Sequence, residues 1–225
     1  MVVAAGARRA AAAPCPVAAG AEARLGAFDG GVRLAWIDEH LTRTAYRTRV
    51  WRDSITVGLV AATFANLAPV PFVAADSRVD WYTGSATTVA GVVPLYVEPL
   101  EILDDAPEVA AEDAAARAGG GGDVCHVLAD AEARLARDAA SQAASQRWWW
   151  HAGNFALNAG VGLFLGVGFH HWLAGAFNFA SGAAIGEAII VTQPTDSVDD
   201  LARYRRGDLG LPAPSTAFLR LGGRF

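Results

Sequence analysis

The chain alternates between stretches without charge and segments in which charged and apolar residues are mixed. Asp, Glu, Lys and Arg are absent from residues 54–75, 81–97 and 148–186. Because a membrane-spanning helix needs about 17–25 mostly apolar residues, the first two stretches fit one helix each. The third fits two helices if the chain turns at His170-His171, where the apolar run is interrupted. The four membrane-embedded helices that this pattern predicts lie near residues 54–73, 81–98, 152–170 and 172–192.

Aromatic residues favour this interpretation, because Trp and Tyr concentrate where a membrane meets water. Every Trp except Trp36 lies near an end of a predicted span. The same residues would also suit the core of a soluble helical bundle, and a mean hydropathy of +0.25 leaves that alternative open. The aromatic residues at the span ends are Trp51, Trp81, Tyr82, Tyr96, Trp148, Trp149, Trp150 and Trp172.

The segments that precede the predicted spans have the pattern of amphipathic helices. In residues 33–51 and 124–147, apolar side chains recur every three or four positions, which is the period of one helix face. A short charged helix is predicted over residues 199–206. The recurring positions include Leu34, Ile37, Leu41 and Ala45 in the first segment, and Val124, Leu128, Ala131, Leu135 and Ala139 in the second.

Small residues in the third and fourth spans predict close helix packing. Glycines four positions apart lie on one helix face, and in membranes this spacing lets a neighbouring backbone approach closely. Gly162 and Gly166 have this spacing in the third span, and Gly182 and Gly186 have it in the fourth. We therefore expect these four glycines to form the packing surface of the second hairpin.

The two predicted hairpins are similar in sequence, since residues 81–105 align without gaps with residues 176–200. Proline lacks the backbone N–H and clashes with the preceding turn, so the matched prolines would end corresponding helices. We infer an internal duplication. The matched residues are Gly91 with Gly186, Pro99 with Pro194, and Asp104-Asp105 with Asp199-Asp200.

Together these features predict an all-α integral membrane protein. Its four membrane-embedded helices would form two duplicated helical hairpins, each preceded by an amphipathic helix. Residues 1–30 are expected to be a disordered, Ala/Gly-rich leader or a degenerate signal peptide. The other predicted units are the first amphipathic helix and hairpin (31–110), a Gly-rich linker (111–123), the second amphipathic helix and hairpin (124–206) and a loose tail (207–225).

The distribution of Arg predicts the orientation of the hairpins. All 18 basic residues are Arg, which together with the abundant Ala indicates a GC-rich bacterial gene. Arg residues flank the outer ends of the spans, whereas the hairpin tips hold only Arg78. Because cytoplasmic loops carry the excess of basic residues, we expect both termini and the middle linker to be cytoplasmic, in a bacterial inner membrane.

Three polar residues inside the predicted spans are candidates for a binding site. Glu187 is the one carboxylate in a span, and intramembrane acids are costly and often functional. Asn158 and Asn178 would either hydrogen-bond between helices or line a path beside Glu187. A structural or interfacial role is the alternative, since Glu187 lies about one helical turn from the end of its span.

Other chemistry is sparse in the sequence. A net charge of −5 offers no basic surface for nucleic acid. Cys15 and Cys125 are too few for a disulfide framework and lack zinc-site spacing, so we expect inert cysteines and no metal site. The adjacent side chains of His170-His171 diverge on a helix. The motifs of phosphate-binding loops, serine hydrolases and zinc proteases are absent, and neither a catalytic residue nor a cofactor is predicted.

The sequence therefore favours a non-enzymatic structural or assembly component of the membrane. Its partners would be the lipid bilayer and either a second copy of the chain or another membrane protein. A small transporter or channel-like oligomer is the alternative function, and it requires oligomerisation because four spans are few for a monomeric pore.

Overall fold

The computed structural model describes residues 15–97, 100–118 and 123–210, and every regular element in these ranges is a helix. The expectation of an all-α chain is confirmed. The elements in chain order are the 3-10 helix η1 (Ala23–Ala27), α1 (Gly30–Leu67), α2 (Arg78–Val92), α3 (Pro94–Val97), α4 (Ile102–Arg117), α5 (Val124–Ser145), α6 (Trp148–Phe169), α7 (Trp172–Thr192) and α8 (Asp196–Arg205).

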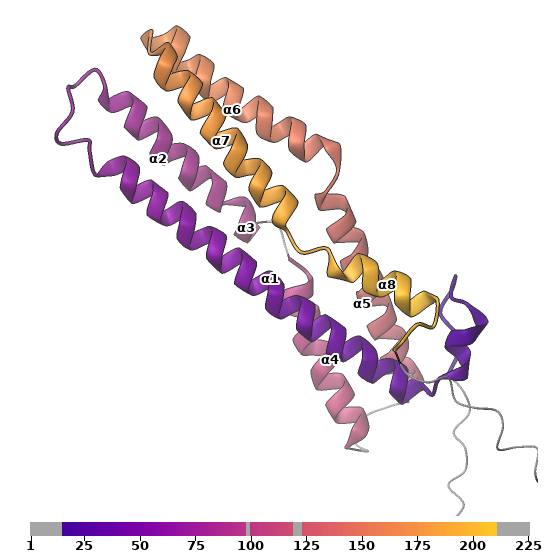
Figure 1. Cartoon of the computed structure of the whole chain (residues 1–225). Helices are drawn as coiled ribbons and strands as arrows, with labels where there is room; N and C mark the ends of the chain where they lie inside the picture. Colours follow the sequence, from indigo (N-terminus) through magenta and orange to yellow (C-terminus); the bar gives the residue numbers. More distant parts are fainter. Residues whose placement is uncertain (1–14, 98–99, 119–122, 211–225) are drawn as a thin grey trace, which may run out of the picture.

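The helices form an elongated molecule with two halves that share α1 (Figure 1). The bundle half contains the N-terminal part of α1, the segment that precedes it, and α4, α5 and α8. The hairpin half contains the C-terminal part of α1 with α2, α3, α6 and α7. In the bundle half α1 packs against α4 and α5, and in the hairpin half it packs against α2, while α6 packs against α7.

The longest helix, α1, runs through both halves without a break. Its 38 residues span about 57 Å at 1.5 Å per residue. Asp29 caps its start, because the Asp29 carboxylate accepts a hydrogen bond of 2.8 Å from the backbone N–H two residues later. The predicted amphipathic helix and first span are therefore one helix, since neither Gly nor Pro interrupts the backbone around Arg52-Asp53. This helix ends at Leu67, before Pro69, and not at residue 73 as predicted.

The hairpin helices lie close to their predicted positions. The turn between α6 and α7 is at His170, as expected, and His170 adopts the left-handed conformation with a φ of 61°. The helix predicted over 81–98 begins earlier, at Arg78, and is interrupted before Pro94 because proline cannot donate to the preceding turn. Pro99, predicted to end this helix, lies outside the described residues.

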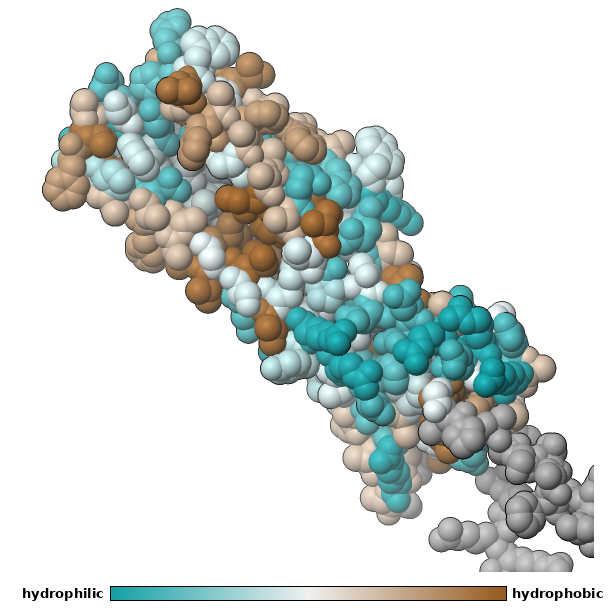
Figure 2. Space-filling model, viewed as in Figure 1, coloured by the Kyte–Doolittle hydropathy of each residue, from teal (hydrophilic) through white to brown (hydrophobic). Residues whose placement is uncertain are grey.

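Apolar side chains are buried in the bundle half and exposed in the hairpin half. The contiguous core belongs to the bundle half, where Leu34, Val109 and Leu128 are at most 1% exposed. In the hairpin half Leu173 is 86% exposed and Phe177 is 71% exposed. Figure 2 shows hydrophilic residues gathered over the bundle half and the more hydrophobic ones towards the hairpin half. A soluble monomer rarely leaves such extensive apolar surface uncovered.

Three helical stretches in the described part of the chain are long and apolar enough to cross a membrane. They are Arg78–Arg117, Trp148–Phe169 and Trp172–Arg205. The first of these includes α2, α3 and α4 and runs over residues 98–99, which lie outside the described residues. The apolar part of α1 is not among them, because it carries Arg52, Asp53 and Asn66 within a short apolar stretch. The structure thus gives three membrane-length helices where the sequence predicted four.

The segments around the predicted hairpins are more ordered than expected. α4 was not predicted as a helix, and it includes residues 111–117 of the range assigned to a Gly-rich linker. Residues 15–29, assigned to a disordered leader, include η1 and bury Leu25 and Phe28 in the core. Leu209 of the predicted loose tail is also buried. Residues 1–14, 119–122 and 211–225 lie outside the described residues.

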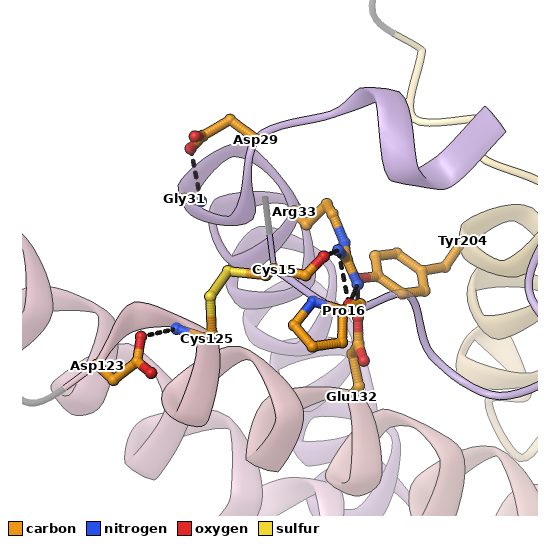
Figure 3. Close-up of a disulfide and its surroundings, with 9 residues drawn as sticks. All are labelled: Cys15, Pro16, Asp29, Gly31, Arg33, Asp123, Cys125, Glu132 and Tyr204. Carbon is orange, nitrogen blue, oxygen red and sulfur yellow. Dashed lines mark hydrogen bonds and ion pairs between the residues drawn. A yellow bond between two sulfur atoms is a disulfide. The ribbon is translucent and has the colours of Figure 1, made fainter. Parts of the chain in front are cut away.

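The expectation that both cysteines are inert is wrong, because Cys15 and Cys125 form a disulfide (Figure 3). The bond links the segment before α1 to the first turn of α5, across 110 residues of sequence. Sequence spacing could not predict this pairing, since it depends on how the N-terminal segment folds back over the bundle. The disulfide joins the segment before α1 to the start of α5. The start of α1 lies at the end of the molecule away from the hairpins (Figure 1).

A buried arginine fixes the same segment. The Arg33 side chain is fully buried, and its guanidinium donates to the Pro16 carbonyl at 3.1 Å and to the Tyr204 hydroxyl at 3.0 Å. Arg33 also forms an ion pair with Glu132 of α5 (Figure 3). This network of side chains joins α1, α5 and α8. Removal of one member would leave the others buried without partners.

We predict that the double substitution Cys15→Ser/Cys125→Ser lowers the free energy of unfolding by about 2–4 kcal/mol, because the unfolded chain regains the entropy of a long loop. Denaturant unfolding of the detergent-solubilised chain, followed by circular dichroism, measures this loss. A reductant should lower the stability of the wild type to that of the variant and leave the variant unchanged. Equal stability of the two oxidised proteins would contradict the prediction.

Candidate functional site

The α6–α7 interface contains most of the residues that the sequence singled out. A Cβ atom built on Gly182 would lie 2.0 Å from the Asn158 side-chain oxygen, and one on Gly186 would lie 2.0 Å from that of Asn154. These glycines of α7 therefore make room for asparagine side chains of α6. The expected approach of a neighbouring backbone occurs elsewhere in the hairpin.

Backbones approach at Gly162 of α6 and Gly175 of α7. A Cβ atom on Gly175 would lie 2.5 Å from the Gly162 carbonyl oxygen, and one on Gly162 would lie 3.0 Å from the Gly175 carbonyl oxygen. Gly166 faces the ring of Trp172, and a Cβ atom built on Gly166 would lie 2.5 Å from that ring. The glycine pattern of the sequence does not indicate Gly175, because α7 has no second glycine four residues from it.

A chain of hydrogen bonds follows this interface, and we call its members the hairpin polar cluster: His151, Asn154, Asn158 and Glu187. The Glu187 carboxylate contacts His151 Nδ1 at 2.6 Å and accepts from Asn154 Nδ2 at 3.0 Å. Asn154 also donates to the Ala183 carbonyl at 2.9 Å, and Asn158 Nδ2 donates to Asn154 Oδ1 at 2.9 Å. The cluster thus joins α6 to α7.

Two of the three candidate binding residues belong to this cluster, and the third does not. Asn178 donates to the Ala174 carbonyl of its own helix at 3.0 Å and lines a groove of about 600 Å³ between α2, α7 and the apolar part of α1. His151 and Asn154 were not among the predicted binding residues, although both lie on the same face of α6 as Asn158. Their spacing of three and four residues was the available signal.

We predict that Gly182→Ala destabilises the hairpin half by about 1–3 kcal/mol, because the added methyl group collides with Asn158 in a tightly packed interface. Thermal unfolding in detergent measures the effect. Gly160→Ala is the matched control, since Gly160 lies on α6 with open space around it. Replacement of Asn158 by Ala should reduce the cost of Gly182→Ala, and full additivity of the two changes would contradict the proposed contact.

A second polar site lies where the bundle half meets the hairpin half. A cavity of about 20 Å³, here called the junction cavity, is lined by Thr48 of α1, Glu101 before α4, Asp138 and Gln142 of α5, and Pro194 before α8. This volume is enough for one water-sized occupant. Asp105 of α4 lies beside the cavity, and side-chain oxygens of Glu101, Asp105 and Asp138 all lie within 4.8 Å of one another.

The three carboxylates of the junction cavity are unequally neutralised. Asp105 accepts from the Arg137 guanidinium at 2.9 Å, and Glu101 lies 3.5 Å from the same guanidinium. Asp138 is 1% exposed, and both of its carboxylate oxygens lack a hydrogen-bond partner. Burial, and then the charges of Asp105 and Glu101, raise the pKa of Asp138 to about 7.

No metal site was predicted from the sequence, and these three acids were not among the predicted site residues. One signal was available in the pattern of α5, because Asp138 interrupts the buried stripe that includes Leu128, Leu135 and Gln142. An acid on the buried face of an amphipathic helix needs a partner. What the sequence lacked was the position of α4, which brings Glu101 and Asp105 to the same place.

Comparisons of this chain with protein family models, with curated proteins and with solved structures found no match.

Proposed function

We propose that this chain is a multi-pass membrane protein with a non-enzymatic structural or assembly role. Its hairpin half would lie in the bilayer and its bundle half at the membrane surface. The observation that carries the proposal is the one-sided burial: the bundle half encloses its own core, whereas the membrane-length helices expose Leu173, Phe177 and other apolar side chains. Lipid tails would cover that surface without further protein.

We further propose that the apolar part of α1 is a fourth membrane-embedded helix. It lies along α2, and the hydroxyl groups of Thr63 and Thr88 are hydrogen-bonded at 2.7 Å between the two helices. Its outer surface is apolar, with Val57 69% exposed and Phe64 67% exposed. The charges of Arg52-Asp53 would then mark the level at which this helix leaves the lipid.

An internal duplication is supported by the pattern of burial as well as by the aligned hairpin sequences. All six buried residues of α5 have a buried counterpart in α1 at one constant spacing. The three buried residues of α8 correspond in the same way to buried residues of α4. The pairs are Leu34 and Leu128, Ile37 and Ala131, Leu41 and Leu135, Thr44 and Asp138, Ala45 and Ala139, Thr48 and Gln142, Ile102 and Ser197, Asp105 and Asp200, and Val109 and Tyr204.

Charged contacts between the two copies repeat at the same positions. Asp105 of α4 lies 3.9 Å from Arg134 of α5, and Asp200 of α8 lies 4.0 Å from His40 of α1. His40 and Arg134 are separated in sequence by the same number of residues as the buried pairs of α1 and α5. Each copy thus directs an acid from the helix after its hairpin to the amphipathic helix of the other copy. This arrangement favours two parallel repeats that evolved to pack against each other.

We predict that the chain remains with the membrane pellet after alkaline carbonate extraction, because its apolar hairpins would have to enter water to leave the bilayer. Fractionation of membranes from expressing cells, followed by immunoblotting, measures the distribution. A chain released to the supernatant would establish the alternative of a soluble helical bundle.

The same protein in proteoliposomes separates the structural role from the transporter alternative. Glu187 and Asn158 are joined in the hairpin polar cluster, but no described hydrogen bond connects Asn178 to it. We therefore expect ion flux no greater than that of empty vesicles. Flux that Glu187→Gln abolishes would establish the transporter alternative and contradict the structural one.

We also propose that the bundle half lies on the non-cytoplasmic face of the membrane. Its disulfide supports this orientation, because disulfides form and persist in oxidising compartments. The distribution of Arg predicts the opposite orientation, with both termini cytoplasmic. Many of these Arg residues have another role in the bundle, where Arg33, Arg134 and Arg137 neutralise acids.

Thiol labelling separates the two orientations. An added cysteine at Asp130→Cys on the exposed surface of α5 should react with a membrane-impermeant maleimide in intact spheroplasts, if the bundle half faces outwards. Ala75→Cys, in the exposed turn between α1 and α2, is the matched control and should react only after permeabilisation. The reverse labelling pattern would establish the cytoplasmic orientation that the Arg residues predict.

A further inference from the structure

The junction cavity contains more unpaired acceptors than any other place in the described part of the chain. The Thr48 hydroxyl and both oxygens of Asp138 are buried without a hydrogen-bond partner. Glu101 Oε2 also lacks a hydrogen bond, and it lies 3.5 Å from the Arg137 guanidinium. Thr48, Glu101 and Asp138 all line the cavity. Thr48 is 3% exposed and Asp138 is 1% exposed, so bulk water does not solvate either side chain. Buried acceptors of this kind require a donor or a cation.

We propose that the junction cavity binds a divalent cation that prefers oxygen ligands, with Ca²⁺ as the best fit, between Glu101, Asp105 and Asp138. The hydroxyl of Thr48 would complete the set from the opposite helix. The proposal rests on the contacts of the junction cavity alone, and it holds for either orientation of the chain in the membrane.

The geometry of the oxygens fits calcium. Calcium binds oxygen at about 2.3–2.6 Å, so ligand oxygens on opposite sides of the ion lie about 4.6–5.2 Å apart. The three carboxylates offer oxygens that all lie within 4.8 Å of one another. The cavity of about 20 Å³, which Glu101 and Asp138 line, holds one occupant of roughly the size of a water molecule. No main-chain movement is therefore needed to bring the ligands together.

The neighbouring Arg residues pair with acids other than Asp138. Arg137 binds Asp105 and lies near Glu101, and Arg134 is directed mainly to Glu112 at 3.0 Å. The Arg137 side chain is 52% exposed and the Arg134 side chain is 16% exposed, and no described ion pair joins either guanidinium to Asp138. An ionised carboxylate that is buried without a partner is costly, and a bound cation would remove that cost.

The chemistry of the donors selects the class of metal. The donors described here are carboxylate and hydroxyl oxygens, without a histidine or cysteine among them. Such donors suit Ca²⁺, Mg²⁺ and Mn²⁺ and disfavour Zn²⁺ and copper. Magnesium needs shorter, near-octahedral bonds and loses its water reluctantly, so we expect it to bind this cavity more weakly than calcium.

A cation at this place would connect the two halves of the molecule. Glu101 and Asp105 stand at the start of α4, directly after the first hairpin, and Asp138 belongs to α5, before the second hairpin. Thr48 lies on α1, on the N-terminal side of the point where that helix enters the hairpin half. The ion would therefore hold α1, α4 and α5 together at the level where the bundle meets the membrane helices.

The test uses the full chain purified in detergent, stripped with EDTA and then unfolded thermally in an excess of CaCl₂, MgCl₂ or MnCl₂. We expect CaCl₂ to raise the unfolding temperature of the wild type, because a ligand that binds only the folded state stabilises it. Asp138→Asn should abolish this shift. In EDTA the same variant should unfold at a higher temperature than the wild type, because it no longer buries an unpaired acid.

The matched control is Asp130→Asn, which removes an exposed acid two turns earlier on the same helix and should keep the full calcium shift. Glu101→Gln, at a partly exposed position, is the second variant and should also lose it. Isothermal titration with CaCl₂ should give one site in the wild type, weakened more than about tenfold by either ligand substitution. Absence of a shift with all three cations, or a full shift in Asp138→Asn or Glu101→Gln, would overturn the proposal.

Discussion

The uneven burial of apolar side chains is the constraint on which the rest of this structure depends. α6 and α7 bury only the narrow faces along which they touch, and their other faces are apolar and exposed. The bundle half, in contrast, encloses Leu34, Val109, Leu128 and Tyr204 in one core. In the proposed membrane location, lipid would cover the hairpins, and the two halves would meet where the lipid ends.

The same constraint explains the polar contacts inside the hairpins. The proposed burial in lipid would leave these side chains dependent on partners within the protein. Asn154 donates to the Glu187 carboxylate across the α6–α7 interface, and Asn158 donates to Asn154 within α6. Gly182 and Gly186 are part of this solution, because only a residue without a side chain leaves space for the asparagines. The glycines and the polar residues of the second hairpin therefore form one packing arrangement.

The proposed duplication would account for the asymmetry of the junction between the two halves. Two amphipathic helices, α1 and α5, pack side by side, and each receives a helix from the end of a hairpin. In the alignment that this duplication implies, Thr44 corresponds to Asp138, and Thr48 corresponds to Gln142. α5 thus contributes an unpaired acid where α1 has a hydroxyl group, which makes the junction cavity asymmetric and acidic.

The sequence by itself determined the helices of the second hairpin, the turn at His170 and the amphipathic character of α1 and α5, because these depend on local periodicity and on runs of apolar residues. It identified Glu187, Asn158 and the glycines, because polar or small residues stand out in such runs. Only the tertiary structure decided the disulfide between Cys15 and Cys125, the continuity of α1 and the meeting of Glu101, Asp105 and Asp138. Each of these depends on how segments far apart in the chain pack together. The local pattern of residues does not show which distant segments come into contact.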